Sequence, residues 1–187
     1  NFTGSTRVGR IIGQLGGKHL TRTVLELGGK APLLVLADAN LEKAAAAANF
    51  GAFMNQGQIC MSTERIVVDT AIADDFIDLL VTRAERTVVG NADDPAAHSG
   101  PVVNQEALDR ILALINDAKA KGAEVLTGGT ADGLRLAPTV IRGVTKDMDI
   151  YSEEIFGPVV AVIEVEDTDS AVEVANDTTY GLSAAVF

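Results

Sequence analysis

Residues 33–69 read LLVLADANLEKAAAAANFGAFMNQGQICMSTERIVVD and indicate the fold class. The apolar run Leu33–Leu36 predicts a short buried strand, and the β-branched run Ile66–Asp69 predicts another. Between them, the alanine-rich segment from Leu41 to about Phe53 is expected to form a helix that leads into a cysteine-bearing loop. A strand, a helix and a second strand in this order are typical of parallel strands joined by a crossover helix. The sequence therefore predicts an α/β fold.

The same alternation of strand and helix signals continues on both sides of this stretch. We expect further strands at residues 1–4, 22–27, 125–126, 136–141 and 159–165, and further helices at about 7–18, 71–88, 105–121 and 170–176. The predicted architecture is a mostly parallel sheet flanked by helices.

Cys60 is the only cysteine of the chain and lies between an expected Gly57-Gln58 turn and small polar residues. A single cysteine can form neither an intrachain disulfide nor a multi-cysteine metal site. Free cysteines are often small buried hydrophobic residues, which is one interpretation of this position. The alternative is an exposed nucleophile, because the turn and the small polar residues around Cys60 would leave its thiolate free to attack.

A carboxylate, Glu26, lies upstream in the stretch Leu25-Glu26-Leu27-Gly28-Gly29-Lys30. One interpretation is a charge at a strand end with no chemical role. The other is a general base for the nucleophile, since a base works best with a pKa near the working pH and the flanking leucines could raise that pKa. A nucleophile paired with a base is the arrangement that covalent acyl chemistry requires.

Residues 2–9 (Phe-Thr-Gly-Ser-Thr-Arg-Val-Gly) join an expected strand to an expected helix. Ser5 or Thr6 can cap that helix, and the free amides and positive dipole end at its start suit a phosphate. The alternative is an ordinary capped helix, since the spacing of the glycines is not that of the usual dinucleotide-binding fingerprint.

Residues 153–159 (Glu-Glu-Ile-Phe-Gly-Pro-Val) place two acids and an aromatic ring before a Gly-Pro turn. A carboxylate here could accept hydrogen bonds from ribose hydroxyls, and Phe156 could pack against a flat ring. The alternative is a solvated acidic loop whose phenylalanine belongs to the core.

Together and in this order, these motifs resemble those of the aldehyde dehydrogenase superfamily along essentially the whole chain. The matching segments are Phe2–Gly9, Leu25–Lys30, Gln56–Cys60, Glu153–Pro158 and Tyr180–Ser183. The resemblance implies the α/β catalytic domain of that superfamily and NAD(P)-dependent oxidation of an aldehyde to the carboxylic acid. Residues 57–65 are most similar to the branch that oxidises aromatic aldehydes, with salicylaldehyde as the expected substrate.

The resemblance assigns the chemistry to Cys60 and Glu26. Cys60 would attack the aldehyde carbon to give a thiohemiacetal, which loses hydride to the nicotinamide and becomes a thioester. Glu26 would activate the water that hydrolyses this thioester, and the backbone amide of Cys60 would contribute to the oxyanion hole. The expected cofactor is NAD, with NADP not excluded, and its expected contacts are Gly4, Ser5, Leu27, Glu154 and Phe156.

The resemblance also implies a domain organisation, with residues 1–29 closing a nucleotide-binding domain and residues 30–187 forming the catalytic domain. Superfamily members are far longer, so we expect a fragment that lacks much of the nucleotide-binding domain and part of the aldehyde pocket. Such a remnant would expose apolar surface, which favours self-association or a homo-oligomer. The alternative is a redox-inactive domain, used only for interaction or retaining at most cysteine-dependent ester hydrolysis.

The composition excludes some classes of partner. A net charge of −11 would repel nucleic acid, and no apolar run approaches the roughly 20 residues of a membrane span. We therefore expect a cytoplasmic protein with no nucleic-acid or membrane partner. No metal is expected, because His98 reads as a solvated loop histidine with no ligand cluster around it. Glu64 and Arg65 follow the cysteine closely and are expected to be structural, without a catalytic role, and could pair with each other.

Overall fold

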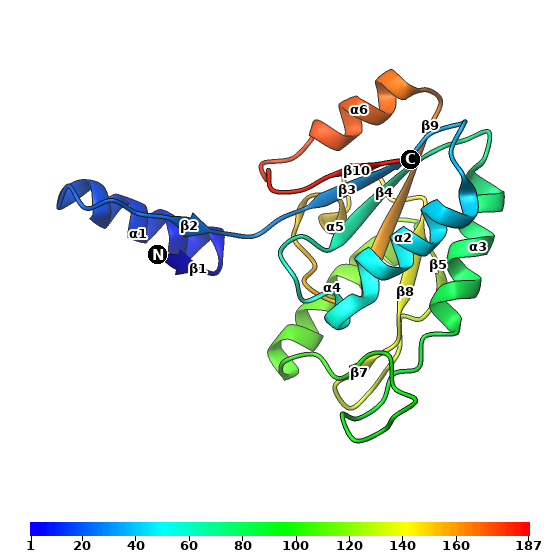
Figure 1. The fold of residues 1–187 in the computed structure, drawn as a ribbon, viewed down its shortest axis with the longest axis horizontal. Coiled ribbons are helices and arrows are strands. Elements are labelled where there is room, and N and C mark those ends of the chain that lie inside the picture. The colour runs from blue at the N-terminus through cyan, green and yellow to red at the C-terminus, as the bar shows by residue number, and fades with distance from the viewer.

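The computed structural model describes residues 1–187 and is built around a six-stranded sheet in the order β10-β3-β4-β9-β8-β5 (Figure 1). All neighbouring strands are parallel except β5, which runs antiparallel to β8. This arrangement confirms the predicted α/β class with a mostly parallel sheet. The strands are β3 (Ala31–Val35), β4 (Thr63–Asp69), β5 (Glu124–Thr127), β8 (Thr139–Arg142), β9 (Val159–Val165) and β10 (Ala185–Val186).

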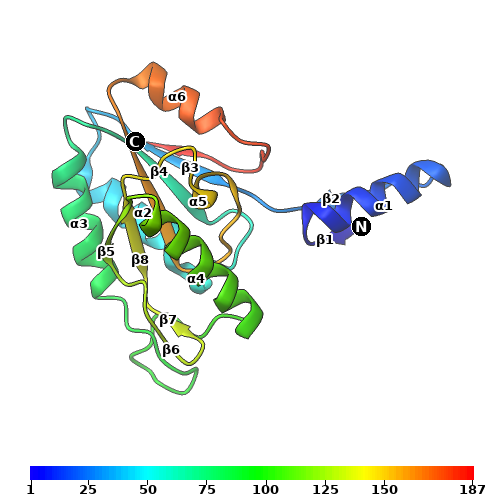
Figure 2. The same cartoon turned by 180° about the vertical axis from the view of Figure 1, so that it is seen from behind.

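Helices cover both faces of the sheet (Figure 2). One face carries α2 (Leu41–Phe53) and α3 (Ala73–Glu85), and the other carries α4 (Gln105–Ala120), α5 (Asp149–Ser152) and α6 (Thr168–Asn176). Successive side chains of β9 alternate between the two layers, because side chains of a strand point to opposite faces in turn. Val160 and Val162 pack with α2 and α3, whereas Val159 and Ala161 pack with α4.

The first 26 residues form a separate N-terminal arm that projects from the sheet domain in both views (Figures 1 and 2). In the arm, β1 (Phe2–Thr3) pairs in parallel with β2 (Leu25–Glu26), and α1 (Thr6–Lys18) connects them. A Cβ atom at Gly9 would overlap the side chain of Leu27, so glycine allows the helix to lie close to the hinge segment, Leu27–Lys30. The hinge segment carries the chain from the arm into β3.

The strand expected over residues 136–141 is wrong as a single element. The chain instead forms β7 (Arg135–Leu136), which pairs antiparallel with β6 (Ala131–Asp132), and starts β8 only after Pro138. Proline has no amide hydrogen to donate and therefore interrupts a hydrogen-bonded ladder. The helix expected over 71–88 is also shorter, since α3 ends at Glu85.

None of the helices combines the length and the apolar character that a membrane span requires. The cytoplasmic location expected from the sequence stays a prediction.

Candidate active site

All the expected site residues line one cleft of about 600 Å³ between the N-terminal arm and the sheet domain. The two walls come from segments far apart in the sequence, so the fold brings together four of the motifs singled out above. The arm and hinge segment contribute Thr3, Gly4, Ser5, Glu26, Leu27 and Gly28, and the sheet domain contributes Gln58, Ile59, Cys60, Arg110, Glu154 and Phe156.

Cys60 lies on a loop with unusual backbone geometry, which we call the cysteine loop (Met54–Ser62). Asn55 and Gln56 adopt left-handed conformations, with φ of 50° and 58°, and Gly57 follows with φ of 65°. Non-glycine residues with positive φ are uncommon and cluster at functional sites. A Cβ atom at Gly57 would also overlap the carbonyl oxygen of Gly157, so only glycine allows this close approach. The result is a half-buried, free Cys60 thiol on the wall of the cleft.

Glu26 lies at the end of β2, on the arm side of the same cleft. The side chain is exposed, and its leucine neighbours are only half-buried. The apolar setting that we expected around this carboxylate is therefore absent from this chain. A solvent-facing carboxylate on the cleft wall can still accept a proton from a water molecule in the cleft.

The start of α1 presents backbone amides to the cleft. Ser5 caps the helix, its Oγ accepting a hydrogen bond from the Val8 amide over 3.4 Å. The first turn contains no acidic side chain, so the positive end of the helix dipole is not neutralised there. This end of the cleft suits a phosphate group, because helix amides and the dipole both favour an anion.

Glu154 lines the cleft from the sheet domain and contacts the hinge segment directly. Its Oε1 accepts a hydrogen bond from the Gly29 amide over 3.0 Å, and a Cβ atom at Gly28 would overlap the carboxylate. Burial raises the pKa of Glu154, while the hydrogen bond from Gly29 opposes that shift. A carboxylate that still faces the cleft can accept hydrogen bonds from sugar hydroxyls, and Phe156 offers a ring surface beside it.

These groups fit a dinucleotide: amides for a phosphate at Ser5, a carboxylate for ribose at Glu154, and an aromatic ring at Phe156. No group of three or more His, Cys, Asp or Glu side chains is arranged to hold a metal ion. His98 is exposed, and its Nδ1 accepts a hydrogen bond from the Val88 amide over 3.1 Å.

The pairing of Glu64 with Arg65 that the sequence suggested is wrong. Glu64 forms a buried ion pair with Lys30, with 2.8 Å between Nζ and Oε2. Burial lowers the pKa of Lys30, and the neighbouring Glu64 carboxylate opposes that shift. Arg65 points elsewhere, because adjacent residues on a strand face opposite sides of the sheet. Its guanidinium donates instead to main-chain carbonyls, including Lys30 over 3.2 Å.

The cleft also contains five residues that were not expected site residues, and of these only Arg110 lies outside the motifs singled out from the sequence; the five are Thr3, Gly28, Gln58, Ile59 and Arg110. Arg110 of α4 and Gln58 of the cysteine loop line the cleft, and Gln58 Oε1 accepts a hydrogen bond from the Val103 amide over 2.9 Å. Arg110 lies on an amphipathic helix, where a charged residue is normally read as part of the solvated face. Nothing in the local pattern marks it as a cleft residue.

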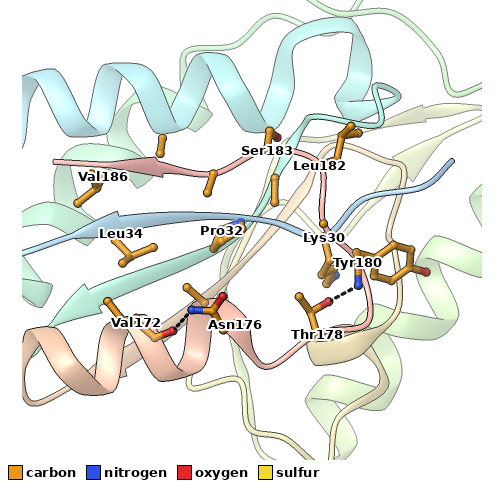
Figure 3. A pocket seen from close by; sticks show the side chains of 15 residues that line it. Lys30, Pro32, Leu34, Val172, Asn176, Thr178, Tyr180, Leu182, Ser183 and Val186 are labelled. Carbon is orange, nitrogen blue, oxygen red and sulfur yellow. Dashed lines mark hydrogen bonds between the residues drawn. The ribbon is translucent and has the colours of Figure 1, made fainter. Parts of the chain in front are cut away.

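A second hollow of about 580 Å³ lies between β3, α6 and the segment Thr178–Val186 (Figure 3). Its lining is mostly apolar, and it includes no carboxylate, thiol or imidazole. Its polar groups are partly used locally, since Asn176 Nδ2 donates to the Val172 carbonyl over 2.8 Å. The amine that reaches it, that of Lys30, is already paired with Glu64 over 2.8 Å.

The whole chain is similar to known proteins. The model of the aldehyde dehydrogenase family matches residues 1–187. The vanillin dehydrogenase of Pseudomonas fluorescens is 52% identical over 187 residues, which cover 100% of this chain and 39% of that protein. This chain therefore spans well under half the length of that relative.

Solved structures give the same result. A salicylaldehyde dehydrogenase from Pseudomonas putida G7, complexed with salicylaldehyde, matches with a TM-score of 0.94 and 50% identity, over 100% of this chain and 39% of that chain. A betaine aldehyde dehydrogenase from Staphylococcus aureus, in complex with NAD+, matches with a TM-score of 0.94 and 37% identity, over 100% of this chain and 38% of that chain.

Proposed function

Since this chain belongs to the aldehyde dehydrogenase family, we propose that it is the cysteine-bearing part of an enzyme that oxidises an aromatic aldehyde to its carboxylic acid. The observation that carries this proposal is the position of Cys60 and Glu26 on one cleft, between helix amides and the Glu154 carboxylate. A nucleophile, a base and a dinucleotide-binding surface are the parts that this oxidation requires.

The reaction begins at the Cys60 sulfur. The thiolate attacks the aldehyde carbon, forming a carbon–sulfur bond and placing negative charge on the former carbonyl oxygen. The Cys60 amide donates a hydrogen bond to that oxygen, where the charge develops. The carbon of the resulting thiohemiacetal must then lose a hydride. NAD, when bound, supplies the acceptor for this hydride.

Glu26 completes the reaction on the acyl group that remains on Cys60. The carboxylate takes a proton from a water molecule, whose oxygen attacks the thioester carbon. The carbon–sulfur bond then breaks, the carboxylic acid leaves and the Cys60 thiolate is restored. The exposed position of Glu26 leaves room for that water molecule.

Five residues would hold the cofactor. Gly4 and Ser5 would bind the pyrophosphate, and Leu27 would contact the cofactor from the hinge segment. Glu154 would accept hydrogen bonds from the nicotinamide ribose, and Phe156 would lie beside the nicotinamide. Because Ser5 and Leu27 precede Lys30, we propose that residues 1–29 belong to a nucleotide-binding domain and residues 30–187 to the catalytic domain.

The aromatic substrate is proposed from two relatives. Their names are vanillin dehydrogenase and salicylaldehyde dehydrogenase, and both are at least 50% identical to this chain. We propose salicylaldehyde as the substrate to test first, with vanillin as the comparison.

The test is NADH formation from salicylaldehyde and excess NAD, followed by absorbance. The wild-type chain should form NADH, and Cys60→Ser should reduce the rate by at least about a hundredfold, since the serine hydroxyl is a far weaker nucleophile. Equal rates in both proteins would remove Cys60 from the mechanism. Turnover by the wild type with NADP but not NAD would correct the cofactor assignment.

A second candidate function is ester hydrolysis without a cofactor. It is favoured by the same cleft, since attack by Cys60 and water activation by Glu26 need no hydride acceptor. Hydrolysis of 4-nitrophenyl acetate that is lost in Cys60→Ala, without any NADH formation from aldehydes, would support this function over the first.

A further inference from the structure

The most heavily hydrogen-bonded carboxylate beside the cleft belongs to Glu64, which is buried on β4 and has no role in the proposed chemistry. Its oxygens accept from the Ile155 amide over 2.9 and 2.8 Å and from the Phe156 amide over 2.9 Å, in addition to the Lys30 ammonium. Hydrogen bonds to a charged acceptor are stronger than those between neutral groups. Glu64 therefore holds two successive amides of the segment Glu153–Pro158, which we call the Glu-Phe loop.

The contacts of Glu64 form part of a closed ring. Lys30 lies in the hinge segment, and Glu64 lies on β4, just after the cysteine loop. The two amides that Glu64 binds belong to the residues that come immediately after Glu154 in the chain. The Glu154 carboxylate returns to the hinge segment through the Gly29 amide, over 3.0 Å. The ring thus links the hinge segment, β4 and the Glu-Phe loop, which are the three segments on which the cleft is built.

The same peptide groups are held from the opposite side by Arg110. Its guanidinium donates to the carbonyls of Glu154, over 2.8 Å, and of Ile155. The next residue, Phe156, has φ of 52°, in the left-handed region that costs free energy for a residue other than glycine. Such a conformation persists only where surrounding contacts determine it, and here Glu64 binds the Phe156 amide itself.

We propose that Glu64 is a positioning residue, which fixes the Glu-Phe loop so that Glu154 and Phe156 face the cofactor. This inference rests on the proposed function, because the orientation of these two side chains matters to catalysis only if the loop binds NAD. Glu64 is 3% exposed and cannot contact the cofactor or the substrate itself.

Substitution by glutamine separates this role from simple filling of space. Glu64→Gln keeps the size of the side chain but leaves one oxygen to accept, so the charged Lys30 ammonium competes for that oxygen with the amides of Ile155 and Phe156. Glu64→Asp retains the carboxylate on a shorter side chain. Glu153→Gln is the matched control, because Glu153 is an exposed acid in the same loop.

Amide hydrogen exchange, measured by NMR, tests the loop directly. In Glu64→Gln the amides of Ile155 and Phe156 should exchange at least about tenfold faster, while Val160 and Val162 in the sheet keep their rates. Glu64→Asp should return part of the protection, and Glu153→Gln should change nothing. Unchanged rates at Ile155 and Phe156, or an equal increase throughout the sheet, would overturn the inference.

In Glu64→Gln the buried Lys30 ammonium loses its charged partner, and the cost of burying that charge could unfold the protein. The double variant Lys30→Met/Glu64→Met removes that charge together with both acceptor oxygens and therefore keeps the test usable, since apolar replacement of a buried pair is often tolerated. Faster exchange at Ile155 and Phe156 is expected in it as well. If both amides stay protected in the double variant, other contacts hold the loop and the inference falls.

Cofactor affinity gives the second measurement. Titration with NAD should show at least about tenfold weaker binding to Glu64→Gln than to the wild type or Glu153→Gln, with KM for NAD affected more than kcat. Equal affinity together with a loosened loop would overturn the positioning role. If the wild-type chain binds no NAD, the proposed cofactor function fails for this chain, and the exchange rates alone decide whether Glu64 holds the loop.

Discussion

The Gly29 amide donates a hydrogen bond to Glu154 Oε1 over 3.0 Å, although the two residues are 125 positions apart in the chain. This contact ties the hinge segment to the Glu-Phe loop. Gly29 also packs against the cysteine loop, since a Cβ atom there would overlap the carbonyl oxygen of Cys60. One glycine therefore sets the separation between the nucleophile and the carboxylate proposed to bind ribose.

Gly29→Ala should displace the cysteine loop, because the added methyl group and the Cys60 carbonyl cannot occupy the same space. We expect a loss of about 1–3 kcal/mol in the free energy of unfolding, as for other overpacked sites, and a changed rate of Cys60 alkylation. Urea unfolding and iodoacetamide labelling measure the two effects. Gly17→Ala is the control, since nothing lies within 4 Å of that position, and a small gain in helix stability is expected there.

Arg65 should be required for the attachment of α6 to the sheet. Its guanidinium donates to the carbonyls of Val174 and Ala175, both over 2.9 Å, and thereby satisfies groups at the carboxyl end of the helix. Arg65→Lys keeps the charge but lacks the planar fork, so we expect a loss of about 2 kcal/mol in the free energy of unfolding. Arg86→Lys, at an exposed arginine, should change stability by less than about 0.5 kcal/mol in the same urea titration.

Acid should weaken the fold partly through Asp177. Hydrogen bonds from Lys146 and from the Tyr151 hydroxyl, each over 2.8 Å, lower the pKa of Asp177 below its ordinary value of 3.8. The charged Asp177 carboxylate therefore stabilises the folded state fully at pH values above 3.8, the ordinary pKa of an aspartate. This stabilisation is lost as the pH falls through the lower pKa that Asp177 has in the folded state. Melting temperatures measured from pH 7 downward should therefore fall less steeply for Asp177→Asn than for the wild type. If the melting temperatures of the two proteins fall with pH at the same rate, Asp177 does not contribute to the loss of stability in acid.

The N-terminal arm should cause self-association. Ile11 and Leu15 are 49% and 51% exposed, and they share one face of α1 because residues four apart on a helix are neighbours. We predict that sedimentation velocity will show concentration-dependent oligomers that the double variant Ile11→Lys/Leu15→Lys reduces. Val172→Lys, which makes the same kind of change on α6, should leave them in place. A wild-type chain that stays monomeric at every concentration would contradict this prediction.

The sequence predicts the order of most helices and strands, because apolar periodicity and turn residues are local signals. It does not predict β10, since two residues carry no periodicity and Ala185–Val186 becomes a strand only by pairing with β3. The sequence also does not predict which side chains pair with each other. Glu64 and Arg65 are adjacent in the chain, yet the pleat sends them to opposite sides, and Lys30 reaches Glu64 only through the parallel pairing of β3 and β4.

The most direct test of the account is acyl transfer to Cys60, which needs no cofactor. After reaction with 4-nitrophenyl acetate, peptide mass spectrometry should find one acetyl group on Cys60, with release of 4-nitrophenolate. In Glu26→Gln this acetyl-enzyme should persist, because hydrolysis has lost its base, whereas in the wild type it should decay. An unmodified Cys60 in both proteins, or an acetyl-enzyme of equal lifetime in both, would contradict the proposed nucleophile and base.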